Sequence, residues 1–187
     1  MTRRTFLTLA AATAVTGCQN REAGTNPQPD SPPNLTVCFP DPTQAVSLRE
    51  VTVEGFQKAL AEQKGKVVLI DVWFLGCAPC VKKFPNFVAL HNKYAGEGVT
   101  GISLDIMPSE VAKKDRVLDF LVKQNAAFPN FIFNDTEAAI DAWMDRYQAV
   151  PTPATVVYNR KGEYVKTLTD ATLEQIEAAV KEQLAAK

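Results

Sequence analysis

The run Val67-Val68-Leu69-Ile70-Asp71-Val72-Trp73-Phe74 decides the fold, because Leu75-Gly76-Cys77-Ala78-Pro79-Cys80 follows it at once. Nearly continuous β-branched and aromatic residues are typical of a strand buried on both faces. A helix is predicted from Cys77 or Ala78 to about Tyr94, with a kink at Pro85, because proline removes one backbone hydrogen bond. The two cysteines therefore lie where a buried strand gives way to a helix.

A Cys-x-x-Cys pair at the start of a helix has a definite chemistry. Unpaired backbone N–H groups and the positive end of the helix dipole stabilise a thiolate at the first cysteine, so the pKa of Cys77 should fall well below ~8.5. Cys77 is then the nucleophile. Cys80, one helical turn later, is placed to attack a mixed disulfide between Cys77 and a substrate, which releases the product. The pattern predicts a thiol-disulfide redox site.

Other uses of the pair have less support. A structural zinc site needs four ligands, and the predicted folded part adds only Cys38 and the single histidine, His91, to the pair. We therefore expect no metal, with Cys38 buried and His91 a packing or surface residue. A purely structural disulfide would close a very short loop and add little stability. Binding of Cu(I) by the two soft thiolates remains an alternative.

Strands and helices alternate along the rest of the chain. The pattern predicts a short strand between residues 46 and 66, helices over 55–63, 109–124 and 136–147, strands over 99–106, 131–133, 154–159 and 163–168, and a last helix that begins with a capping box of Thr172 and Gln175. This alternation predicts an α/β fold, a three-layer α/β/α sandwich with a mixed central sheet.

The segment from Val68 to Cys80 resembles the active site of thioredoxins and of TlpA-like membrane-anchored thiol-disulfide oxidoreductases. Three offsets carry the resemblance: Asp71 lies six residues before the first cysteine, Trp73 four before it, and Pro85 five after the second. The similarity extends from about residue 46 to 187. It implies a thioredoxin fold with a TlpA-like helix-strand insertion between Ile106 and Asp135, and an enzyme that reduces protein disulfides without a cofactor.

The resemblance also gives Asp71 a role. Asp71 matches the buried aspartate of thioredoxin, and burial in an apolar strand should raise the pKa of its carboxyl. Such a group near Cys80 is suited to take the proton of the resolving thiol. The alternative is an aspartate at a strand end that backbone donors satisfy.

A substrate-binding surface is implied around the cysteines. It comprises Trp73, Gly76, Ala78, Pro79, Thr152 and Pro153. We expect a cis peptide bond before Pro153 that exposes the backbone of Thr152 for pairing with a client; the alternative is that both prolines of the loop are trans. Gly76 departs from the family, which usually has tryptophan there. Glu110 resembles an insertion glutamate of some relatives, but we expect a solvated residue at a helix start.

Residues 1–17 are predicted to be an export signal. Arg3 and Arg4 precede an apolar run that is too short to span a bilayer. Val15-Thr16-Gly17-Cys18 resembles the lipobox of bacterial lipoproteins, which predicts a lipid on Cys18; ordinary cleavage is the alternative. The paired arginines also resemble a twin-arginine signal. Residues 18–45 are polar and Pro-rich, which predicts a tether, and residues 46–187 form the predicted thioredoxin-like domain.

The composition and motifs of the chain restrict the partners and cofactors that we expect. Twenty basic residues against 21 acidic ones leave no net positive charge for nucleic acid. No G-x-G-x-x-G motif for a nucleotide cofactor is present, so electrons would have to come from a membrane partner. We expect a monomer in the bacterial cell envelope, facing the periplasm, that exchanges with protein thiol or disulfide clients, for example in c-type cytochrome maturation. The same chemistry in reverse would make it an oxidant, and a copper(I)-delivery module is the other alternative.

Overall fold

The computed structural model describes residues 46–186. Its elements, in chain order, are β1 (Arg49–Val51), α1 (Val53–Ala61), β2 (Val67–Trp73), α2 (Ala78–Tyr94), the 3-10 turn η1 (Ala95–Glu97), β3 (Val99–Asp105), the 3-10 helix η2 (Pro108–Lys113), α3 (Lys114–Lys123), β4 (Asn130–Phe133), α4 (Glu137–Arg146), β5 (Ala154–Tyr158), β6 (Tyr164–Thr169) and α5 (Leu173–Ala185). The predicted signal, Cys18, the tether and Cys38 lie outside the described residues.

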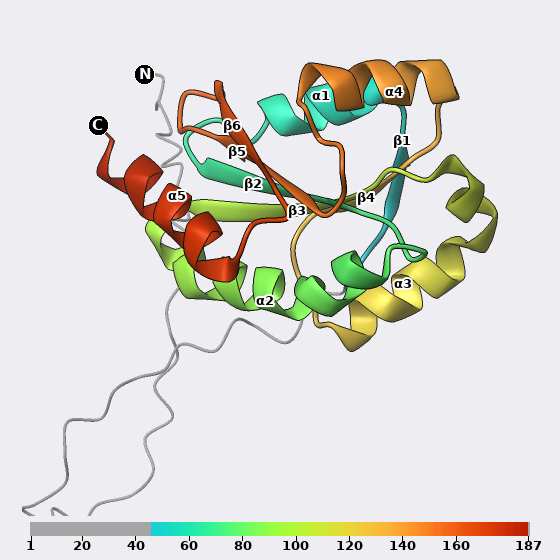
Figure 1. Ribbon diagram of the computed structural model, residues 1–187, viewed down its shortest axis with the longest axis horizontal. Coiled ribbons are helices and arrows are strands. Elements are labelled where there is room, and N and C mark those ends of the chain that lie inside the picture. Colours follow the sequence, from blue (N-terminus) through green and yellow to red (C-terminus); the bar gives the residue numbers. More distant parts are fainter. Residues whose placement is uncertain (1–45, 187) are drawn as a thin grey trace, which may run out of the picture. The chain divides into compact units, whose positions relative to one another are not determined.

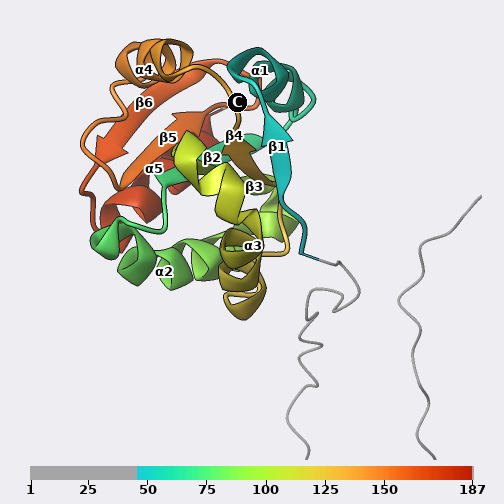
Figure 2. The same cartoon turned by 90° about the vertical axis from the view of Figure 1, so that its right-hand side faces the viewer.

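Six strands form one mixed sheet in the order β1-β4-β3-β2-β5-β6. The first four are mutually parallel, whereas β5 runs antiparallel to both β2 and β6. Helices α1 and α4 cover one face of the sheet, and α2, α3 and α5 cover the other (Figure 1). The perpendicular view in Figure 2 shows the same layers. The predicted three-layer sandwich with a mixed sheet is confirmed.

Strand β2 lies between β3 and β5, and every residue of it is buried. Its side chains alternate between two cores, as the pleat of a strand requires. Leu69 and Trp73 belong to the core under α2, α3 and α5, and Ile70 and Val72 to the core under α1 and α4. Because both faces are covered, the strand is apolar apart from Asp71, which is the pattern that identified it in the sequence.

The insertion provides β4, which pairs with β3 on one side and β1 on the other. Its helical part was predicted as one helix over residues 109–124. The structure instead has η2 followed by α3, so the turn around Pro108 is wound more tightly than expected. Proline has no N–H for helical bonding and favours such a first turn. The other predicted elements are confirmed within two or three residues of their bounds, including the capping box at Thr172.

None of the helices within residues 46–186 is long and apolar enough to cross a membrane.

Candidate redox site

Cys77 is the N-cap of α2, directly after the short turn that leaves β2. The turn is closed by the N–H of Cys77, which donates to the carbonyl of Phe74 at 3.0 Å. Pro79 lies in the first turn of the helix, where its missing N–H costs nothing, and Pro85 lies inside the helix. Strand, turn and helix thus place both cysteines as the sequence predicts.

Cys77 and Cys80 form a disulfide, with their Cα atoms 5.3 Å apart. Cys77 Sγ also accepts a hydrogen bond from the N–H of Cys80 at 3.3 Å, which is the usual bond of an N-cap side chain. When the pair is reduced, the backbone N–H groups at the start of α2 stabilise a thiolate at Cys77. Cys77 is 7% exposed and Cys80 1%, so Cys77 is the sulfur that a partner reaches first.

Thr152 approaches Cys77 from the loop before β5. Its hydroxyl donates to Cys77 Sγ at a distance of 3.7 Å. The peptide bond before Pro153 is cis, as expected, and so is the bond before Pro151, which the sequence did not single out. The structure therefore brings the loop at Thr152 and Pro153 to the cysteines, although 75 residues separate Thr152 from Cys77.

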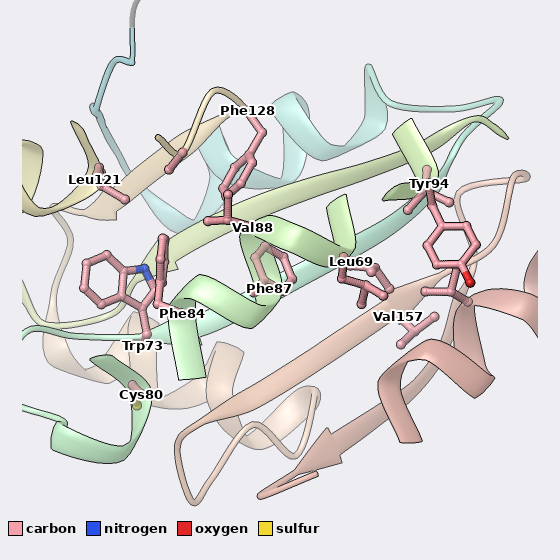
Figure 3. Packing of buried hydrophobic residues seen from close by; sticks show 14 of the residues in the cluster. Leu69, Trp73, Cys80, Phe84, Phe87, Val88, Tyr94, Leu121, Phe128 and Val157 are labelled. Atoms are coloured by element: carbon pink, nitrogen blue, oxygen red, sulfur yellow. The ribbon is translucent and has the colours of Figure 1, made fainter. Parts of the chain in front are cut away.

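Trp73 does not belong to the substrate surface, contrary to our expectation. Its side chain is fully buried, with ring centroids 4.9 Å from Phe84 of α2 and 5.0 Å from Phe120 of α3. Figure 3 shows Trp73 beside Phe84, at the end of the apolar cluster that also holds Cys80. The next residue, Phe74, lies just after the end of β2, is half-buried and packs against the edge of the same cluster. Trp73 therefore packs against α2 and α3 inside the core.

The other expected substrate-binding residues divide into two groups. Gly76, Ala78 and Pro79 are exposed around the disulfide, whereas Pro153 is buried and Thr152 half-buried. A Cβ atom added at Gly76 would lie only 3.1 Å from the ring of Phe74. Phe74 therefore occupies the space that a larger residue at position 76 would need.

Asp71 points to the same face of β2 as Leu69 and Trp73, which is the face covered by α2. It is 7% exposed, and burial raises the pKa of its carboxyl to about 7, while the charge of Lys83 acts in the opposite direction. Asp71, Lys83 and Pro153 line one cavity of about 390 Å³. The carboxyl therefore has a route to solvent and a proton affinity suited to exchange near neutral pH.

Glu110 contradicts our expectation of a solvated residue. Its two carboxylate oxygens accept the N–H groups of Leu75 at 3.0 Å and Gly76 at 3.3 Å, so it holds the turn before Cys77. Burial, and then the neighbouring Glu110, raise the pKa of Asp105, the last residue of β3. Asp105 therefore keeps its proton near neutral pH.

His91 is not near the cysteines. It lies 14 residues after Cys77, about 20 Å along the helix axis, and its Nδ1 accepts the N–H of Gly101 at 3.0 Å. Within residues 46–186 no three His, Cys, Asp or Glu side chains come together as a metal site would need. The expectation that His91 is a packing residue agrees with this contact and with its ring lying 5.0 Å from that of Phe128.

The fold and the site define a class of protein, the thiol-disulfide oxidoreductases of thioredoxin fold. Residues 39–184 match the model of the Redoxin family, and the chain belongs to that family. The thiol-disulfide oxidoreductase ResA of a Bacillus cereus strain is 32% identical over 126 residues, which cover 67% of this chain and 68% of that protein. ResA of Bacillus subtilis is 28% identical over 122 residues, covering 65% of this chain and 63% of its own length.

Solved structures agree on the fold. A thiol-disulfide isomerase from Corynebacterium glutamicum has a TM-score of 0.59 at 20% identity, with 67% of this chain and 86% of that one covered. A thiol:disulfide interchange protein of the thioredoxin family from Chlorobium tepidum has a TM-score of 0.53 at 19% identity, with 67% and 84% covered. The TlpA-like assignment made from the sequence is confirmed by these relatives and the family match.

Proposed function

We propose that the protein reduces disulfides in other proteins by dithiol exchange, with Cys77 as the attacking thiolate and Cys80 as the resolving thiol. The observation that carries the proposal is the asymmetry of the pair. Cys77 caps α2 and is the more exposed sulfur, whereas Cys80 is buried one turn inside the helix. An outer sulfur stabilised by backbone N–H groups attacks, and an inner sulfur within 5.3 Å between Cα atoms completes the exchange.

The exchange takes two steps. The Cys77 thiolate attacks one sulfur of the client disulfide, and the other client sulfur leaves as a thiolate. Cys80 then loses its proton and attacks Cys77 Sγ, which expels the remaining client sulfur and forms the Cys77–Cys80 disulfide. Two electrons pass from the cysteine pair to the client. Asp71 is proposed to accept the Cys80 proton, since its raised pKa of about 7 makes it a base of suitable strength.

The client is proposed to bind across the surface next to Cys77. Gly76, Ala78 and Pro79 are exposed there. Thr152 and Pro153 form the opposing loop, and Thr152 contacts Cys77 Sγ. Within residues 46–186 the backbone of Thr152, just before β5 begins, makes no backbone hydrogen bond, which suits strand-like pairing with an extended client segment.

We further propose that the protein works in the bacterial cell envelope, facing the periplasm, anchored through a lipid on Cys18 after removal of residues 1–17. Residues 18–45 would serve as the tether, and a membrane protein would return electrons to the disulfide. Clients in c-type cytochrome maturation fit a reductase in that compartment. Few large apolar side chains of residues 46–186 are strongly exposed, namely Val122, Val150 and Tyr164, which supports a monomer.

The test is insulin reduction by the wild type, Cys77→Ser and Cys80→Ser, together with the reduction potential of the pair. We expect Cys77→Ser to be inactive and Cys80→Ser to accumulate mixed disulfides. Wild-type activity in Cys77→Ser would refute the catalytic assignment. A potential near that of known oxidants, roughly −120 mV, would reverse the proposed direction. Mass measurement of the membrane-fraction protein tests the lipid on Cys18.

A further inference from the structure

A groove adjoins the redox site and takes no part in the exchange itself. It has a volume of about 530 Å³ and lies between α4, the segment after β3 and the loop before β5. Its apolar lining includes Ile106, Met107, Ile140, Met144 and Val150. Apolar lining of this kind holds one or two aliphatic side chains of a bound segment.

The groove is continuous with the reacting sulfur. Thr152 lines it, and the same residue donates to Cys77 Sγ at 3.7 Å. Val150, two residues earlier, also lines the groove and is 63% exposed. An extended segment advances about 3.3 Å per residue, so residues two to four positions from a client cysteine at Cys77 reach this groove.

One wall of the groove is acidic. Glu137, Asp141 and Asp145 follow each other at intervals of four residues on α4, which puts them on one helix face over about 12 Å. All three are exposed. Among residues 46–186 no salt bridge neutralises them, and no Lys, Arg or His lines the groove. Arg146, the one basic residue of α4, lies over the ring of Tyr147.

We infer that this groove selects client segments that carry an apolar residue and a Lys or Arg within about four residues of the reacting cysteine. The inference rests on the proposed function, because it assumes that a client cysteine reaches Cys77. The apolar side chain enters between Met107 and Met144, and the basic side chain lies against Asp141 and Asp145. Opposite charges across such a surface raise the association rate and reject acidic segments.

The experiment compares two disulfide-containing peptides that differ only in two positions, both Lys or both Glu, placed three and four residues after the cysteine. Single-turnover rates are measured with reduced protein at low salt. We expect the Lys peptide to react about tenfold faster than the Glu peptide. In Asp141→Asn/Asp145→Asn, and in wild type at 1 M salt, the ratio should approach one, because salt screens exposed charges.

Two controls distinguish a failure of the proposed function from a failure of the inference about the groove. Asp115→Asn/Asp119→Asn removes the same charge from exposed positions of α3 and should keep the wild-type ratio. Hydroxyethyl disulfide, which is uncharged, reports the exchange chemistry of the wild type alone. If that disulfide is not reduced, the proposed function fails. If it is reduced but both peptides react equally, or the α3 variant also loses the ratio, the inference about the groove is overturned. Circular dichroism checks that each variant is folded.

Discussion

Glu110 accepts the backbone N–H of Gly76, the residue directly before Cys77, at 3.3 Å. A helix-strand insertion thereby holds the turn that delivers the attacking sulfur. The bond also brings a negative charge close to that sulfur, and a nearby negative charge disfavours a thiolate. Glu110 thus orders the turn, and we expect its charge to lower the reactivity of Cys77.

Glu110→Gln should therefore raise reactivity at low pH. The amide keeps an acceptor for one N–H but removes the charge, so the pKa of the Cys77 thiol falls and more thiolate is present. We expect the single-turnover rate at pH 6 to rise about threefold. Thiolate absorbance against pH gives the pKa directly. Glu62→Gln, exposed near the opposite end of β2, is the control. A slower rate in Glu110→Gln would mean that ordering of the turn matters more than charge.

Thr152→Val should have the opposite effect. Valine keeps the shape of threonine but removes the hydroxyl that donates to Cys77 Sγ. A thiolate that loses a donor is less stable, so the pKa of Cys77 rises and the rate at pH 6 falls about threefold. The two variants share one assay and predict opposite signs. An unchanged thiol titration in Thr152→Val would show that the contact exists only in the disulfide form.

Asp71→Asn should change how stability depends on pH. The carboxyl binds its proton more tightly in the folded protein, with a pKa of about 7, than in the unfolded chain, with a value of 3.8. Its contribution to stability is therefore complete below pH 3.8 and is lost as pH rises through 7. The variant cannot ionise, so it should gain stability relative to wild type between pH 4 and pH 8, by at most roughly 4 kcal/mol.

Urea unfolding of the oxidised protein measures this difference, because the cysteines do not titrate in the disulfide. The carboxyl of Asp105, also raised in pKa, is common to both proteins and cancels in the comparison. A stability difference between variant and wild type that is constant from pH 4 to pH 8 would show that Asp71 ionises normally.

Substitutions of Lys83 and of Asp170 should change the pKa of the Asp71 carboxyl in opposite directions. Lys83 Nζ lies 2.7 Å from Asp170 Oδ1, and the positive charge of Lys83 lowers the pKa of Asp71. Lys83→Met should raise the pKa of Asp71, and Asp170→Asn, which leaves the lysine unneutralised, should lower it. The carbon chemical shift of the Asp71 carboxyl gives both values. Shifts of the same sign would mean that Lys83 acts through packing and not through charge.

The sequence predicted the fold where local pattern and burial agree. Residues 67–73 are apolar apart from Asp71 because both faces of β2 are covered, and the cysteines follow where this buried strand meets the start of a helix. Thr172 and Gln175 make a capping box from residues three apart, so no tertiary information is needed to find it. These features were predictable because their causes lie within a few residues.

The features that the sequence did not predict depend on contacts between segments that are far apart in the chain. Glu110 meets Leu75 and Gly76 across 35 and 34 positions, and nothing in its own neighbourhood indicates this. Trp73 was assigned to the substrate surface from its offset to Cys77, but it is the last residue of a strand that is buried on both faces. The nearly continuous apolar run around Trp73, which is typical of a strand buried on both faces, was the available signal, and it would have corrected that assignment.

The aromatic contacts of Trp73 tie the insertion to the helix that carries the cysteines. The ring centroids of Phe84 in α2 and Phe120 in the insertion lie 5.1 Å apart, and both rings contact Trp73. Strand β4, also part of the insertion, lies between β1 and β3 in the sheet. Residues 106–135 are therefore not a detachable module. Removing them to obtain a minimal thioredoxin would remove the contact of Phe120 with Trp73, the pairing of β1 with β4 and the carboxylate of Glu110 at the turn before Cys77. A shortened design would need compensating changes in all three places.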